Sequence, residues 1–386
     1  MCFECCRSSI SKSRRASANL LTNPPSATHH AARLCQFIVK PTQDPHPDSD
    51  EADSAAEVSE WVRTLRRAGL AQSPAPRLEA LTGGVSSEII LVEDGRRRFV
   101  VKRALAKLRV RDDWFADTGR SGVEQAYLRV VGALLPSCVP RVLFADPEAG
   151  WFAMEYLGDG FVNWKSQMLA GRADSSAAQR AGEALGVVHR ETWGNPAMAA
   201  EFATGPNFHQ LRIEPYLETA ARRVPDLAGP LLDEAARLQG TALALVHGDF
   251  SPKNILVAPD RIVLLDAEVG WFGDPVFDTA FLLNHLFLKA LLHANAPDAM
   301  IGLARIFWTA YTQALGARAD AGLEARTVRL LLCLMLARVH GKSPVEYLPE
   351  PLKQRCVVEF VRAHLPNPPA LLADLIAAWR EQLSHL

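Results

Sequence analysis

Residues 246–278 read VHGDFSPKNILVAPDRIVLLDAEVGWFGDPVFD, and they carry the strongest fold signal in the chain. Polar residues follow short apolar runs: His247-Gly248-Asp249 comes after one run, and Asp266-Ala267-Glu268 after another. Asn254 lies five residues beyond Asp249, and Asp278 precedes a long apolar segment. Short apolar runs bounded by turn residues are typical of buried strands. The stretch therefore predicts that strands and the loops beside them present carboxylate and amide groups together.

This set of side chains suits metal-assisted transfer of a phosphoryl group. Such a transfer needs an oriented hydroxyl and cations on the phosphate oxygens, with little covalent help. Asp249 is the predicted catalytic residue, because its carboxylate can accept the proton of an acceptor hydroxyl. Asn254, Asp266 and Glu268 are the predicted Mg²⁺ ligands, since Mg²⁺ prefers oxygen donors and the two acids are expected to share one strand face. A solvated turn remains the simpler interpretation for any single Asp, and a structural core histidine the simpler one for His247.

The order H-G-D-x4-N followed by D-x-E resembles the aminoglycoside phosphotransferase and choline kinase superfamily, which are relatives of protein kinases. The resemblance covers about residues 78–347 and implies ATP as the phosphoryl donor. It also implies that Asp278 braces the catalytic loop through backbone N–H groups. Within the superfamily, residues 266–278 and 100–114 are most similar to the S-methyl-5-thioribose kinases. The chain departs from those kinases at residues 251–254 and 338–344, and the second departure leaves the acceptor open.

The N-terminal third is expected to bind the nucleotide. Small residues at positions 82–87 lie between β segments, where backbone N–H groups can approach phosphate, although a simple hairpin turn fits them as well. Lys102 ends the following strand and is expected to reach the α/β-phosphates, with Glu124 on the next helix as its partner. The backbone of residues 155–156 would contact adenine where the two lobes join. The predicted nucleotide-binding residues are Gly83, Gly84, Ser86, Lys102, Glu124, Glu155 and Tyr156.

The acceptor pocket is expected between residues 177 and 238 and in the C-terminal segment. Its predicted residues are the cations Arg212, Arg338 and Lys342, and His209 and Trp164 are further candidates that could equally be scaffold. A polycationic aminoglycoside would meet like charges there, so a neutral or anionic sugar-like alcohol is the favoured acceptor. An aminoglycoside O-phosphotransferase remains one alternative. A non-catalytic, pseudokinase-like binding protein is another, although it would not need the full set of site residues.

A β-rich N-terminal third is followed by a hinge and then by a helical part. This order predicts an α+β, bilobal protein-kinase-like fold. The expected divisions are a disordered tail (1–56), an N-lobe (57–156) and a C-lobe (157–386). The tail is basic up to residue 42 and acidic from 44 to 60, without apolar periodicity. It resembles a transit peptide only weakly, and a plain tail or a mis-assigned start fits better.

Composition restricts the partners and the location. Lys and Arg total 42 against 43 Asp and Glu, which argues against a surface built for nucleic acid or anionic lipid. Apolar stretches such as 330–337 are far shorter than the roughly 20 residues of a membrane helix. The seven cysteines are an odd number and favour a reducing compartment over a disulfide framework. A cytoplasmic protein that acts on a small hydroxylated molecule is expected, and a homodimer is an open alternative.

Overall fold

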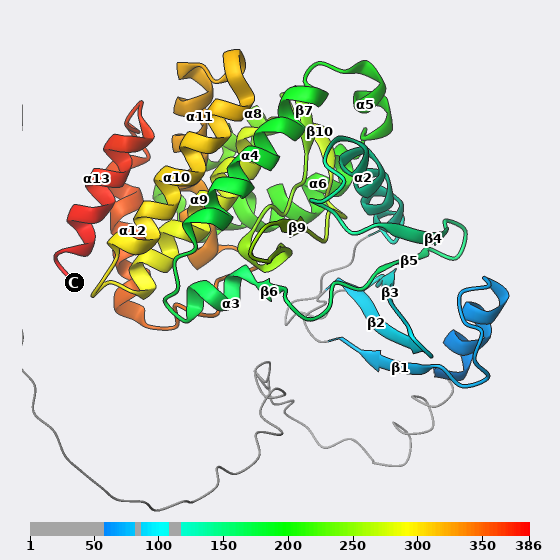
Figure 1. The fold of residues 1–386 in the computed structure, drawn as a ribbon. Coiled ribbons are helices and arrows are strands. Elements are labelled where there is room, and N and C mark those ends of the chain that lie inside the picture. Colours follow the sequence, from blue (N-terminus) through cyan, green and yellow to red (C-terminus); the bar gives the residue numbers. More distant parts are fainter. Residues whose placement is uncertain (1–57, 82–85, 108–116) are drawn as a thin grey trace, which may run out of the picture. The chain divides into compact units, whose positions relative to one another are not determined.

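The structure is a computed structural model that describes residues 58–81, 86–107 and 117–386 (Figure 1). These residues belong to one compact unit, 57–386. The predicted disorder of residues 1–56 and the predicted phosphate contacts of Gly83 and Gly84 lie outside the described residues.

An antiparallel five-stranded sheet forms the N-terminal part. Its strands lie in the order β1-β2-β3-β5-β4, and the β2–β3 turn closes at Gly95, whose φ of 64° favours glycine. Side chains alternate between the two faces: Ile90 and Val92 pack with the helix of residues 58–67, whereas Leu91 joins the core that contains α2. The sheet therefore holds β3 between two apolar layers. The bounds are β1 Arg77–Ala80, β2 Ser87–Asp94, β3 Arg97–Ala104, α2 Arg120–Leu134, β4 Val142–Asp146 and β5 Trp151–Glu155.

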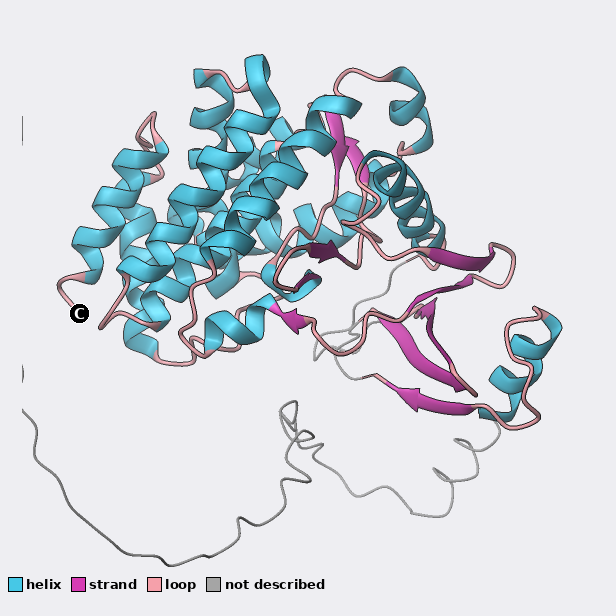
Figure 2. Cartoon of the chain, viewed as in Figure 1, coloured by secondary structure: helices cyan, strands magenta, loops and turns pink. Residues whose placement is uncertain are grey.

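The remainder is mainly helical, as Figure 2 shows in cyan. Helix α9 (Val276–Leu292) lies at its centre and is buried from its first residue to Leu291. Helices α4 (Ser175–Thr192) and α10 (Asp298–Leu315) touch through glycine, because a Cβ on Gly182 would lie 2.4 Å from the carbonyl oxygen of Phe307. The other helices are α3 Trp164–Leu169, α5 Pro196–Glu201, α6 Gly205–Phe208, a π-helical segment His209–Glu218, α7 Thr219–Arg223, α8 Ala228–Gln239, α11 Ala321–His340, α12 Pro351–His364 and α13 Leu372–Leu383.

Two small sheets hold the loops of residues 246–278. Strand β7 (Ala244–Val246) pairs with β10 (Trp271–Gly273), and β8 (Ile255–Val257) pairs with β6 (Val162–Asn163) and β9 (Ile262–Leu264). The β7–β8 loop contains residues 247–254, and the segment after β9 contains Asp266 and Glu268. The prediction that these two acids share a strand face is wrong. The strand ends at Leu264, and Asp266 adopts the left-handed conformation with a φ of 66°, which breaks the two-residue alternation.

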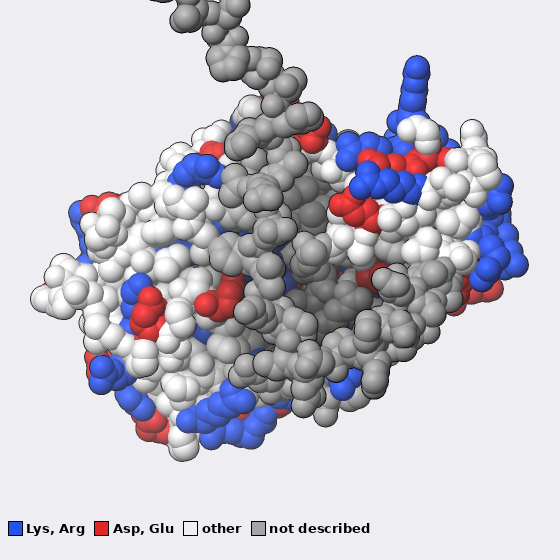
Figure 3. All heavy atoms as spheres, turned by 90° about the horizontal axis from the view of Figure 1, so that it is seen from below, with Lys and Arg blue, Asp and Glu red and all other residues white. Residues whose placement is uncertain are grey.

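The α+β class is confirmed by these elements. Within the described ranges, no helix is both long and apolar enough to cross a membrane. Basic and acidic side chains lie beside one another at several places on the face in Figure 3, in line with the balanced charge of the sequence.

Candidate active site

The loop after β7 is held in place by Asp278 at the start of α9. The carboxylate of Asp278 accepts hydrogen bonds from the backbone N–H groups of His247 (2.7 Å) and Gly248 (2.9 Å). Gly248 has a φ of 76°, and a Cβ there would lie 2.4 Å from the carbonyl oxygen of Val269, so only glycine fits. The loop conformation thus depends on a buried acid and on a residue without a side chain.

His247 has a structural place in the same loop. Its Nδ1 accepts a hydrogen bond from the backbone N–H of Asp249 at 3.2 Å, and its ring packs edge-on against Tyr127 and Phe250. Burial lowers the pKa of His247 below its ordinary value, and a neutral ring with Nδ1 as acceptor agrees with that direction.

Asp249 is buried between two cations. Its Oδ2 lies 2.9 Å from Nζ of Lys253 and 3.2 Å from Nη2 of Arg212. Burial alone would raise the pKa of this carboxyl, but Lys253 and Arg212 outweigh burial and hold the pKa below its ordinary value. Asp249 is therefore ionised at neutral pH and can accept a hydrogen bond from a hydroxyl group.

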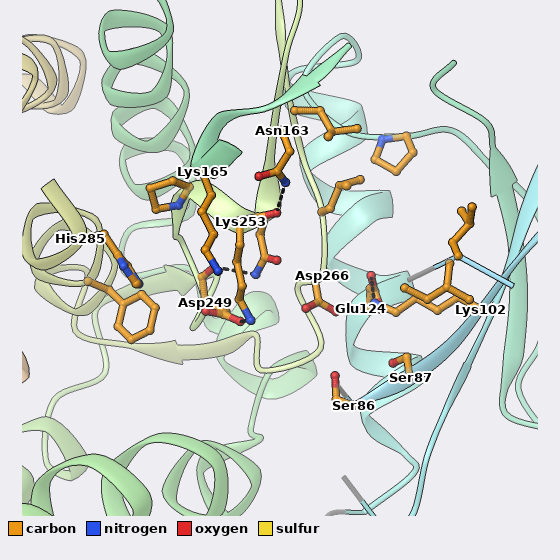
Figure 4. A pocket seen from close by; sticks show the side chains of 18 of the residues that line it. Ser86, Ser87, Lys102, Glu124, Asn163, Lys165, Asp249, Lys253, Asp266 and His285 are labelled. Carbon is orange, nitrogen blue, oxygen red and sulfur yellow. Dashed lines mark hydrogen bonds and ion pairs between the residues drawn. The ribbon is translucent and has the colours of Figure 1, made fainter. Parts of the chain in front are cut away.

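Lys102 links an acid of α2 to the segment after β9. Its Nζ lies 2.7 Å from Oε2 of Glu124 and 2.5 Å from Oδ1 of Asp266 (Figure 4). Burial alone would lower the pKa of Lys102, but Asp266 and Glu124 raise it, so the ammonium stays charged. Asp266 has a lowered pKa, because Lys102 and Lys253 outweigh its burial. The predicted Lys102–Glu124 pair is present.

Asn254 and Asp266 offer oxygen donors of the kind that Mg²⁺ prefers. The amide nitrogen of Asn254 donates to the carbonyl oxygen of Asp249 at 3.0 Å, which fixes the orientation of its amide oxygen. Among the described residues, no group of three or more His, Cys, Asp or Glu could hold a metal ion by itself. Mg²⁺ is commonly bound through one or two protein oxygens together with substrate phosphates. The pair therefore fits a metal that is held jointly with a nucleotide.

Glu268 has different neighbours from the other two predicted ligands. Its Oε2 lies 3.0 Å from Nε of Arg120 and 3.4 Å from Oγ of Ser87, and all three residues are buried. Glu268 does not line the cleft that Asn254 and Asp266 line. These contacts favour a structural role for Glu268, in which it ties the segment after β9 to β2 and to the start of α2.

A cleft of about 600 Å³ brings most of the predicted site residues together. One group is apolar and suits a flat base. It comes from the sheet and the residues just beyond its strands, from β8 and from the segment after β9: Leu81, Ile89, Val100, Met154, Leu157, Leu256 and Leu265. The predicted residues that line the cleft are Ser86, Lys102, Glu124, Glu155, Tyr156, Asp249, Asn254, Asp266 and Arg338. The backbone N–H of Glu155 already donates to the carbonyl oxygen of Arg141 at 2.9 Å, so it is not free for adenine.

Only one of the three predicted acceptor cations lines this cleft. Arg338 does so, and its Nη1 lies 3.0 Å from the hydroxyl of Tyr216. Lys342 does not; its Nζ pairs with Glu214 at 2.8 Å. Arg212 is also absent from the lining, because Asp249 and the carbonyl oxygen of Gly248 engage it.

The two further acceptor candidates lie away from the cleft as well. Trp164 is completely buried in the core, and His209 pairs with Glu218 at 2.9 Å. Both positions agree with a structural role, which the sequence also allowed for these residues.

Four basic residues of the cleft were missed from the sequence: Lys165, Lys253, His285 and Lys289. The sequence did contain a signal for Lys253 as a site residue, since it lies four residues after Asp249 on the loop predicted to be catalytic. The sequence also contained a signal for Lys289, because a lysine inside the apolar run of residues 276–292 has to be buried or paired. Lys165 carried no comparable pattern.

The sheet, the helical part and the cleft with its lysine–glutamate pair define a protein-kinase-like fold. The model of the phosphotransferase enzyme family matches residues 77–306, and the chain belongs to this family.

Two curated relatives are methylthioribose kinases. The one from Pectobacterium carotovorum subsp. carotovorum (strain PC1) is 29% identical over 224 residues, which cover 51% of this chain and 56% of that protein. The one from Yersinia pseudotuberculosis serotype O:3 (strain YPIII) is 28% identical over 221 residues, covering 50% and 54%. The chain thus spans a little over half the length of the curated relatives it matches.

One solved structure shares the fold, and a second is similar to a lesser degree. Amicoumacin kinase hAmiN, in complex with AMP-PNP, Ca²⁺ and Ami, has a TM-score of 0.51 at 14% identity, covering 83% of this chain and 97% of that one. A choline/ethanolamine kinase family protein from Mesorhizobium loti has a TM-score of 0.48 at 18% identity, covering 84% and 99%. At such identities the likeness concerns the fold alone.

Proposed function

We propose that the chain is a cytoplasmic, ATP- and Mg²⁺-dependent kinase that phosphorylates a hydroxyl group of a small, sugar-like molecule. The observation that carries the proposal is that Asp249 lines the same cleft as Lys102, Asn254 and Asp266. Three free thiols among the described residues, Cys138, Cys333 and Cys356, fit the reducing cytoplasm.

The nucleotide would occupy the part of the cleft beside the sheet. The apolar residues there suit adenine, and Lys102 is held in position by Glu124 so that its ammonium can reach phosphate oxygens. Bound Mg²⁺ would neutralise charge on those oxygens, and Asp266 with Asn254 would hold it. The lowered pKa of Asp266 keeps this residue anionic for that role.

Asp249 would position the acceptor and take its proton. The acceptor oxygen forms a bond to the γ-phosphorus while the bond between that phosphorus and the β,γ-bridging oxygen breaks, and ADP leaves. The hydroxyl proton passes to the carboxylate of Asp249 in the course of the transfer. Lys253 and Arg212 keep that carboxylate ionised beforehand, so it faces the hydroxyl as an acceptor.

The acceptor class follows from charge and from the relatives. Lys165, Lys253 and Arg338 line the cleft and would repel a polycationic aminoglycoside. The methylthioribose kinases among the relatives support a sugar-like acceptor. A binding protein without activity is disfavoured, because it would not need Lys102, Asp249, Asn254 and Asp266 on one cleft.

The test is phosphoryl transfer from radiolabelled ATP by the full chain, with and without Mg²⁺, to a panel of sugars, alcohols and aminoglycosides. We expect Mg²⁺-dependent transfer to a sugar or alcohol, and little transfer to kanamycin. Asp249→Asn is the control, since it should still bind ATP. Efficient transfer to an aminoglycoside would favour the alternative acceptor, and ATP binding without transfer to any acceptor would favour the non-catalytic alternative.

A further inference from the structure

Lys289 is a lysine in the middle of the buried helix α9. It has 0% exposure, and among the described residues its ammonium group has no hydrogen-bond partner. Its Nζ lies 4.6 Å from the centre of the Tyr347 ring. A buried amine without a hydrogen-bond partner costs considerable free energy, and a ligand that supplies the missing partner would offset that cost.

Lys289 is one of the residues that line the cleft that contains Asp249. Lys165, His285 and Arg338 line it too, and Nε of Arg338 is a second buried nitrogen without a partner among the described residues. Figure 4 shows His285 on the opposite side of Asp249 from Lys102 and Glu124, with Lys165 beside Asp249 and Lys253. This end of the cleft is therefore separate from the lysine–glutamate pair proposed for the nucleotide.

Positive charge is in excess at this end. Lys165 and Arg338 contribute two cationic side chains and Lys289 a third when it is protonated, and the acid near them is Glu346, which pairs with Lys165. Burial, together with the charges of Lys165 and Arg338 and opposed by Glu346, lowers the pKa of Lys289 to about 7. His285 stays neutral, because burial and Lys289 hold its pKa well below the ordinary value. Burial raises the pKa of Tyr347, so this side chain is neutral as well.

We propose that Lys289 and Arg338, with Lys165 beside them, form a subsite for an oxyanion substituent of the acceptor, a carboxylate or a phosphate group. The inference rests on the proposed kinase function and narrows its acceptor to a hydroxylated anion. The oxyanion would supply hydrogen-bond acceptors to Nζ of Lys289 and Nε of Arg338, which lack them. Tyr216 and Phe281 line the same cleft and offer apolar surface to the carbon skeleton between the anion and the hydroxyl.

The proposal predicts a pH dependence of anion affinity. An anion beside Lys289 favours the protonated amine, so binding raises the pKa of Lys289 and takes up a proton. Affinity should be highest below pH 7 and should fall as pH rises above 7, where the free enzyme loses that proton. A carboxylate probe is ionised throughout this range, so the change reports on the protein.

The experiment measures binding by calorimetry to the full chain, with and without AMP-PNP and Mg²⁺, for two matched pairs of probes. D-Ribonate is compared with ribitol, and D-ribose 5-phosphate with D-ribose. We expect at least one acid to bind about 10- to 100-fold more tightly than its neutral partner, the range for charge-assisted hydrogen bonds. Whichever acid shows the preference identifies the oxyanion as carboxylate or phosphate.

Variants test whether the proposed subsite causes the preference for the acid over its neutral partner. Lys289→Met should abolish it and its pH dependence, leave binding of the neutral partner within about twofold, and keep or raise the melting temperature, because an apolar side chain suits that position. Lys353→Met, on the surface of α12 and outside the cleft, is the matched control and should behave as wild type. Arg338→Gln is a second variant and should weaken binding of the acid alone.

Two results would overturn the subsite: no tighter binding of either acid than of its neutral partner, or a preference that survives in Lys289→Met. Binding of AMP-PNP distinguishes this failure from that of the kinase proposal. Intact AMP-PNP binding with equal acid and neutral affinities overturns the subsite alone, and absent AMP-PNP binding overturns the kinase proposal.

Discussion

Arg212 places its Nη2 3.2 Å from Oδ2 of Asp249, so an arginine predicted to bind the acceptor contacts the carboxylate that we propose to be catalytic. Its Nε also donates to the carbonyl oxygen of Gly248 at 2.5 Å. Arg212 therefore stabilises both the charge of Asp249 and the loop that carries it. With Lys253 on the other side, the carboxylate is ionised and held in one orientation before any acceptor binds.

Replacing the carboxylate of Asp249 tests the catalytic role directly. Asp249→Asn keeps the shape of the side chain but removes the group that accepts the hydroxyl proton. We expect kcat to fall by about 10² to 10⁴-fold, the range for general-base positioning, with little change in ATP affinity. Steady-state kinetics and ATP titration measure both quantities, and an unchanged kcat would show that another group takes the proton.

The charge of Lys253 should set the acid limit of activity. Its ammonium lies 2.9 Å from Asp249 and is one of the two cations that lower the pKa of that carboxyl. Activity needs the ionised carboxylate, so it is lost as pH falls through this pKa. Lys253→Met should raise the pKa and move the acid limb of the kcat profile to higher pH. Lys353→Met is the control, and an acid limb that stays in place in Lys253→Met would contradict the assignment.

Much of this site could be predicted because it depends on local sequence. A lysine near the end of a strand and a glutamate on the next helix are brought together by the fold, and Lys102 and Glu124 are indeed paired. The loops around Asp249 and Asp266 follow short apolar strands that the sequence also indicates. The sequence also predicts a helical C-terminal part, and the structure contains one.

The missed contacts depend on conformations that a pattern does not reveal. Glu268 was assigned by strand alternation, which the left-handed Asp266 interrupts. Arg212 lies in a π-helical segment, where the wider turn changes the direction of each side chain from that in an α-helix. A lysine stands out in the apolar run of helix α9, but only the cleft shows which site Lys289 borders.

Adding one methyl group to the catalytic loop should disrupt it. Gly248 combines a φ of 76° with a carbonyl oxygen 2.4 Å from the position of a Cβ. Gly248→Ala should therefore cost about 1–3 kcal/mol of stability from backbone strain, and more where the loop cannot move. Thermal or urea unfolding measures the loss. Gly302→Ala in α10 is the matched control, because a Cβ there meets nothing within 4 Å. Equal effects of the two substitutions would contradict the argument.

The two proposed metal ligands, Asp266 and Asn254, should differ in how much they contribute to Mg²⁺ binding. Asp266 supplies a full negative charge, so Asp266→Ala should abolish Mg²⁺-dependent ATP binding. Asn254 supplies a neutral oxygen, and Asn254→Ala should weaken the Mg²⁺ dependence without removing it. Titration of ATP at a series of Mg²⁺ concentrations separates the two. Wild-type activity in excess EDTA would exclude a metal-dependent mechanism.

Glu268 provides the sharpest test between the sequence-based assignment and the contacts in the structure. If it binds Mg²⁺, Glu268→Gln should weaken the Mg²⁺ dependence of ATP binding at least as much as Asn254→Ala. If it holds Arg120 and Ser87, the same substitution should leave that dependence unchanged and lower the stability by about 1–3 kcal/mol, because a buried charged hydrogen bond is weakened. We expect the second result.

Arg120→Lys should then cause a similar loss of stability. Lysine cannot reproduce the fork of hydrogen bonds through which the guanidinium also reaches the carbonyl oxygens of Ser86 and Leu105. Unfolding curves and Mg²⁺ titrations of both variants distinguish the two roles of Glu268. A weaker Mg²⁺ dependence in Glu268→Gln alone would show that Glu268 is a metal ligand.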